Sequence, residues 1–101
     1  MKEIVVGMGF YKREQWERLL ETADDAVILE RSYDEWLGIF DSAIETIKGK
    51  GAAPELVMVD VEELLCFCRE KGLFNNAKAR ALYVSELVRR RYGHADSDRN
   101  D

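Results

Sequence analysis

The chain has 101 residues, of which 47% are hydrophobic and 35% are charged, and its formal net charge is −5. This composition is typical of one soluble globular domain and excludes a disordered chain. The longest apolar stretch, Ile4 to Tyr11, is much shorter than the ~20 residues that a membrane-spanning helix needs, so we expect no membrane contact.

Charge is distributed unevenly along the chain. Residues 1–63 hold 15 acids and 7 bases, residues 64–92 hold 2 acids and 7 bases, and residues 93–101 hold 3 acids and 1 base. An acidic part joined to a basic part attracts a second copy of the chain, an acidic partner or nucleic acid. Alternatively, the two parts neutralise each other within one fold.

Two features predict a cytoplasmic protein. Met1-Lys2-Glu3 carries an acid, and no small-residue cleavage site of a secretory signal follows it. The chain has only two cysteines, Cys66 and Cys68, which is consistent with a reducing compartment.

The first half of the chain predicts a strand followed by two helices. Residues 3–8 form a β-branched apolar run, and the apolar spacing after them predicts a helix over about 11–23, ended by Asp24-Asp25. Residues 26–29 are a short strand or a packed loop, and their small number favours the loop. The next helix opens with a capping box, Ser32 to Glu35, and its aromatic stripe is expected in the core: Tyr33, Trp36 and Phe40.

The second half begins with a buried strand over about 55–60. Asp60 closes this strand and also opens a helix over 61–71, because Asp60 and Glu63 have the spacing of a capping box. Gly72 is expected to end that helix.

A last helix is expected from a cap at Asn75 or Asn76 to about Arg91. Leu82 and Tyr83 lie off its apolar stripe, and if both are exposed, the pair would suggest a contact surface. The stripe itself runs through Ala77, Ala81, Val84, Leu87 and Val88. Residues 93–101 lack any apolar residue larger than Ala and are expected to form a flexible tail.

The predicted fold is a single α+β domain over residues 1–92, in the order β-α-α-β-α-α, with a two-stranded sheet packed against about four helices. The strands can run parallel or antiparallel. An unpaired strand edge is a binding site for a second chain, so we expect a homodimer.

The sequence predicts no enzyme, metal site or cofactor. Its only histidine, His94, lies in the expected tail, so catalysis by Ser-His or Cys-His lacks an ordered base. Cys66 and Cys68 point about 200° apart on a helix and cannot share a metal, and Cys68 is expected in the core.

A glycine-containing segment after the first strand is a candidate anion site. It has the order strand, glycines and helix that binds phosphate in nucleotide folds, although the third glycine of that pattern is absent. The candidate residues are Gly7, Gly9, Lys12 and Arg13. The alternative interpretation is a turn that needs flexible glycines.

Residues 61–91 have the arrangement of a helix-turn-helix and form a candidate nucleic-acid contact. Asn, Lys and Arg at the start of the second helix are the types that reach base edges. The candidates are Asn75, Asn76, Lys78 and Arg80, with Arg89 and Arg90 near the other end. Three observations weaken this interpretation: the turn is long, the last arginines spread around the helix, and cations are favoured at any helix C-terminus.

Several motifs resemble those of a family of short uncharacterised bacterial proteins. The motifs are Gln-Trp-Glu-Arg-Leu-Leu at 15–20, Tyr-Asp-Glu-Trp-Leu at 33–37, Val-Asp-Val-Glu-Glu-Leu-Leu at 59–65, Cys68, Gly72-Leu73 and the alanine-rich 77–87. This resemblance covers most of residues 11–90. It implies a small stand-alone bacterial cytoplasmic protein and no known activity, cofactor or catalytic residue.

The sequence as a whole therefore predicts a small protein that binds itself or another protein and regulates it. The alternative function is nucleic-acid binding through residues 61–91.

Overall fold

A computed structural model describes the backbone of residues 4–100 and the side chains of residues 4–92. The described chain contains two strands and four α-helices in the order β-α-α-β-α-α, which confirms the predicted α+β class. The bounds of these elements are β1 Val5–Phe10, α1 Arg13–Thr22, α2 Tyr33–Gly49, β2 Ala53–Met58, α3 Val61–Lys71 and α4 Ala77–Asn100. The segment 26–29, expected as a packed loop, contains a single turn of 3-10 helix, η1 (Ala26–Ile28).

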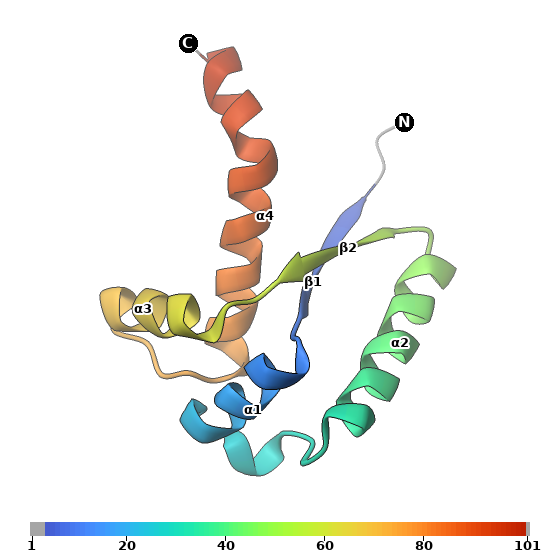
Figure 1. Ribbon diagram of the computed structural model, residues 1–101. Coiled ribbons are helices and arrows are strands. Elements are labelled where there is room, and N and C mark those ends of the chain that lie inside the picture. The colour runs from blue at the N-terminus through green and yellow to red at the C-terminus, as the bar shows by residue number, and fades with distance from the viewer. Residues whose placement is uncertain (1–3, 101) are drawn as a thin grey trace.

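The two strands run parallel, in a register that pairs Phe10 with Met58. Parallel strands need a long crossover, and α1 and α2 provide it (Figure 1). β1 begins and ends two residues later than the predicted 3–8, and β2 begins and ends two residues earlier than the predicted 55–60. Each strand extends only where the other strand provides a hydrogen-bonding partner. Residue 3 lies outside the described residues.

The strands lie between α4 and α2 (Figure 1). On the α4 side, a Cβ added at Gly7 would lie 2.6 Å from Val88 Cγ2, and one added at Gly9 would lie 3.0 Å from Val84 Cγ2. Both glycines lie within β1 and not in a turn. Their role is therefore to let α4 pack closely on the strand, which replaces the predicted flexible turn.

Aromatic side chains fill the space between the strands, α1 and α2. The ring of Phe10 lies 5.5 Å from Trp36 and 5.3 Å from Phe40, measured between centroids. Trp16 stacks on Trp36 at 5.1 Å. The predicted core stripe is confirmed: Trp36 and Phe40 are buried, and Tyr33 is partly buried.

The predicted capping box at Ser32, the predicted N-cap at Asp60 and the predicted stop at Gly72 are confirmed, whereas the return bond from the Asp60 N–H to the Glu63 carboxylate is not formed. Ser32 Oγ accepts a hydrogen bond from the Glu35 N–H at 3.0 Å, and the Glu35 carboxylate accepts from the Ser32 N–H at 3.3 Å. Asp60 Oδ1 accepts from the Glu63 N–H at 3.1 Å. Gly72 ends α3 with a φ of +68°, a left-handed conformation that favours glycine.

The last helix differs from its prediction in its buried face. The residues that it buries or partly buries are Ala79, Arg80, Tyr83, Val84, Glu86, Leu87 and Val88. Ala77 and Ala81, expected on the apolar face, are exposed. The two glycines of β1 explain the difference, because they receive the helix along Val84 and Val88.

The same helix is also longer than predicted. It continues to Asn100 instead of ending at about Arg91. The flexibility of residues 93–101 stays a prediction, and residue 101 lies outside the described residues.

Replacing Gly7 with Ala should destabilise the protein by about 1–3 kcal/mol, because the new methyl group overlaps Val88 in a packed helix–strand contact. Gly38→Ala in α2 is the matched control. Its Cβ would meet no atom within 4 Å, so it should stabilise the helix by about 0.5–1 kcal/mol. Urea unfolding measures both. Equal stability of the Gly7→Ala variant and the wild type would contradict the close packing of α4 on β1.

Candidate functional site

Arg80, which the sequence placed on a nucleic-acid-binding face, is buried and paired. Its guanidinium donates to both carboxylate oxygens of Asp25, at 3.0 Å to Oδ1 and 2.8 Å to Oδ2. Its Nη1 also donates to the backbone oxygen and to Oδ1 of Asn75, each at 3.1 Å. The planar guanidinium of arginine presents N–H donors side by side, which suits hydrogen bonds to both oxygens of one carboxylate. The interpretation of Arg80 as a base contact is therefore wrong.

Asn75 belongs to the same buried cluster and is also removed from the candidate surface. Its backbone N–H donates to Asp24 Oδ2 at 2.7 Å, and its backbone oxygen accepts from the Asp24 N–H at 2.9 Å. Asp25 Oδ2 accepts from the N–H of Ala77, the first residue of α4, at 3.1 Å. The two aspartates, expected only to end a helix, thus attach the turn before η1 to the start of α4.

The other polar candidates mostly have internal partners. Asn76 caps α4, since its Oδ1 accepts from the Ala79 N–H at 3.0 Å. Arg89 and Arg90 both form ion pairs with Glu86, one turn earlier on the same helix. Lys78 is exposed and forms no ion pair with a residue whose side chain is described.

Tyr83 points into the protein, whereas Leu82 points outward. The ring of Tyr83 packs against Phe67 with 5.3 Å between centroids, and its hydroxyl donates to the Glu63 carboxylate at 3.4 Å. Burial, and next the negative charge of Glu63, raise the pKa of Tyr83 to about 12. Leu82 and Tyr83 therefore do not form an exposed pair, and of the two only Leu82 offers apolar surface.

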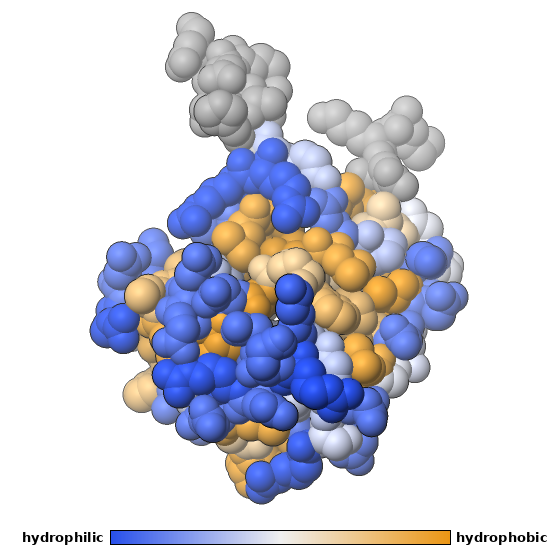
Figure 2. All heavy atoms as spheres, viewed as in Figure 1, coloured by the Kyte–Doolittle hydropathy of each residue, from blue (hydrophilic) through white to orange (hydrophobic). Residues whose placement is uncertain are grey.

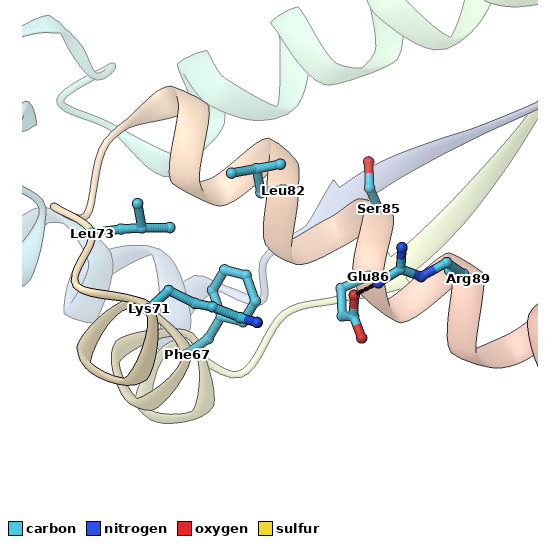
Figure 3. Close-up of a pocket in the computed structure, with 7 residues that line it drawn as sticks. All are labelled: Phe67, Lys71, Leu73, Leu82, Ser85, Glu86 and Arg89. Atoms are coloured by element: carbon cyan, nitrogen blue, oxygen red, sulfur yellow. Dashed lines mark hydrogen bonds and ion pairs between the residues drawn. The ribbon is translucent and has the colours of Figure 1, made fainter.

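Leu82 lies in a groove between α3 and α4 (Figure 3). The larger part of the groove has a volume of about 370 Å³ and is lined by Phe67, Lys71, Leu73, Leu82, Ser85, Glu86 and Arg89. A smaller hollow of about 150 Å³ shares Leu73 and Leu82 with it and adds Phe74 and Lys78. We call the two hollows together the α3–α4 groove.

The end of α3 produces the apolar lining of this groove. The Leu73 N–H donates to the Cys68 oxygen at 2.8 Å, and the Gly72 N–H donates to the Arg69 oxygen at 3.3 Å. These two bonds form a Schellman motif, which turns the chain sharply. Leu73 and Phe74 follow the turn, and both remain exposed beside Leu82.

The rim of the groove carries positive charge. Lys71 Nζ lies 5.9 Å above the centroid of the Phe67 ring, a cation–π contact that keeps the ammonium at the groove. Neither Lys71 nor Lys78 has an ion-pair partner among the residues with described side chains. The groove therefore combines an apolar floor with two cations that can pair with an acidic partner.

The residues of the candidate anion site do not converge. Gly7 and Gly9 face α4, as described above. Arg13 forms an exposed ion pair with Asp34 at 3.4 Å and lies 4.8 Å from the centroid of the Tyr33 ring. Lys12 is exposed at the N-cap of α1. The two glycines therefore face α4 and do not join Lys12 and Arg13 in the predicted anion site.

The cysteines lie as predicted on opposite sides of α3. Cys66 is exposed, whereas Cys68 is buried, and burial raises the pKa of the Cys68 thiol. Within the described side chains, no three His, Cys, Asp or Glu residues are close enough to hold a metal ion. The side chain of His94 lies outside the description.

Sequence reasoning found one residue of the groove floor, Leu82, and missed Phe67 and Leu73. The available signal was the glycine turn: a helix that ends at Gly72 and is followed at once by Leu73 and Phe74 exposes apolar side chains. The chain matches no protein-family model, no curated protein and no solved structure. The resemblance to short bacterial proteins over residues 11–90 stays a prediction.

The ion pair of Asp25 with Arg80 predicts a pH-dependent stability. Hydrogen bonds from Arg80, and its positive charge, hold the pKa of Asp25 below the ordinary value of about 3.9. The stabilisation is complete above that ordinary value and is lost as the pH falls through the lower pKa of the folded state. We expect Asp25→Asn to flatten the acid side of the stability curve measured by urea unfolding. Asp41→Asn, at an exposed site in α2, controls for the loss of one carboxylate, and an equal flattening there would contradict the prediction.

Proposed function

We propose that the protein acts by binding an acidic, partly apolar surface of another protein molecule in the α3–α4 groove. One observation carries this proposal: exposed apolar side chains line the groove, and unpaired lysines stand at its rim. Apolar anchors that fill a pocket supply most of the affinity in protein interfaces, and charge at the rim selects the partner.

The charge distribution and the apolar floor of the groove favour a protein partner over nucleic acid. A phosphate backbone is held by a row of free cations, whereas here Arg80 is buried and Arg89 and Arg90 pair with Glu86. The floor is made of Phe67, Leu73 and Leu82, which suit an apolar side chain.

We also propose that the protein regulates its partner and works in the cytoplasm. Both cysteines are free, which suits a reducing compartment. In the described part of the chain, no helix has the length and apolar character needed to cross a membrane.

A second apolar surface lies over the sheet and belongs to the predicted strand-edge homodimer. Leu56 and Met58 of β2 are about half exposed. Figure 2 shows a band of apolar side chains over this region, between α4 and α2. Pairing of two chains through a strand edge stays a prediction, and this surface provides a matched control for the groove.

Leu82→Glu should abolish partner binding, because it places a negative charge on the apolar floor of the groove. Leu56→Glu is the matched control, since Leu82 is 46% exposed and Leu56 is 47% exposed. Each tagged protein is recovered from its own cells after nuclease treatment, and the co-purified proteins are quantified. We expect a stoichiometric protein with the wild type and with Leu56→Glu, and none with Leu82→Glu.

Two results would contradict the proposed function. One is a partner that the Leu82→Glu variant retains while its thermal unfolding matches that of the wild type. The other is loss of all bound material on nuclease treatment, which would favour nucleic acid.

A further inference from the structure

Val27, on η1, is the most exposed large apolar side chain of the described residues, and its neighbour Ile28 is also strongly exposed. Val27 is 81% exposed and Ile28 is 68% exposed. They stand on a single helical turn between α1 and α2, at one end of the molecule (Figure 1). Two exposed apolar side chains on a short projecting turn can insert into a groove on another molecule. We call Val27, Ile28 and Glu30 the η1 knob.

The surroundings of the η1 knob are acidic. Residues 24–41 hold six acids and one base. Glu30 forms no ion pair with a described side chain, and with Asp34 and Glu35 it lines a shallow hollow of about 510 Å³ that also contains Ile39. The knob therefore has an exposed apolar tip, and the residues beside that tip are negatively charged.

We infer that the occupant of the α3–α4 groove is the η1 knob of a second copy of this chain. This inference rests on the proposed function and names its partner. Val27 and Ile28 supply the apolar tip that the groove floor accepts, and Glu30 supplies the negative charge that Lys71 and Lys78 lack. The η1 knob and the α3–α4 groove are thus complementary both in apolar surface and in charge.

The contact joins two different surfaces and is therefore head-to-tail. In Figure 1, η1 lies between α1 and α2, whereas the groove lies between α3 and α4. Every chain carries one knob and one groove. Head-to-tail contacts of this kind produce a closed ring or an open chain of subunits.

The hydrogen-bonded cluster of Asp24, Asp25, Asn75 and Arg80 holds the knob in place for this contact. Asp25 is the residue directly before η1, and its carboxylate is bound by Arg80 and by the N–H of Ala77. The knob is therefore attached to the first turn of α4, the helix that forms one wall of the groove. This attachment fixes the angle between the surface that inserts and the surface that receives.

Complementation between two blocked variants tests the inference. Val27→Asp with Ile28→Asp blocks the knob and leaves the groove, and Leu82→Glu blocks the groove and leaves the knob. All three positions are largely exposed, so both variants should fold, which circular dichroism checks. Mass is measured by light scattering on a sizing column at about 10 µM to 1 mM, a range that includes weak specific contacts.

The inference predicts a distinct result for each sample. The wild type should increase in mean mass with concentration, and each variant alone should stay at the 11.7 kDa of one chain. An equimolar mixture should form a species of two chains and nothing larger, because one knob and one groove remain and pair once. The mass of the wild type should fall as salt is added, since the rim contact is between charges.

Three results would overturn the inference. They are a wild type that stays monomeric up to 1 mM, a mixture that forms no heterodimer, and association that only Leu56→Glu abolishes. The first would leave the proposed function intact, because recovery of another partner from cells tests it separately. A partner lost from Leu82→Glu with a monomeric wild type would then identify the groove as a site for a different protein.

Discussion

The ion pair between Asp25 and Arg80 is the contact on which the placement of both candidate surfaces depends. It joins the residue before η1 to the first turn of α4, across a sequence separation of 55 residues. Arg80 is buried and Asp25 is partly buried, so removing Asp25 would leave a buried guanidinium without its charge partner. In fully buried pairs this costs about 3–5 kcal/mol, which sets the upper bound here, against the about 5–15 kcal/mol that stabilises a typical domain. Because Asn75 also bonds Arg80, the same contact positions the turn that supplies Leu73 and Phe74 to the groove.

The rest of α4 is held by the sheet. Two strands alone bury too little apolar surface to be stable, so the helices on both faces must provide it. Gly7 and Gly9 cost conformational entropy in a strand, yet they allow Val84 and Val88 to approach the backbone directly. The helix is thereby oriented with Tyr83 inward and Leu82 outward. The groove is thus a consequence of how the helix lies on two glycines.

The fold could be predicted from the sequence wherever the signals were local. Capping at Ser32 and Asp60 and the left-handed Gly72 involve residues within a few positions of one another, and all three were found. The site was predicted less well, because the burial of Arg80 depends on Asp25 and no spacing rule connects two residues so far apart. The glycines of β1 were misread for the same reason, since the helix that requires them is about 80 residues later in the chain.

The two interpretations of the uneven charge are therefore each partly realised. Arg80 pairs with Asp25, and Arg91 pairs with Glu55, so two bases of the basic segment neutralise acids of the first part of the chain. Arg89 and Arg90 instead pair within their own helix. Among the described side chains that internal pairing leaves over, Lys71 and Lys78 stand at an apolar groove, and Glu30 stands beside an apolar turn. The rim of a protein interface combines charge and exposed apolar side chains in the same way. These three charges are the ones that the proposed contact with a second chain would use.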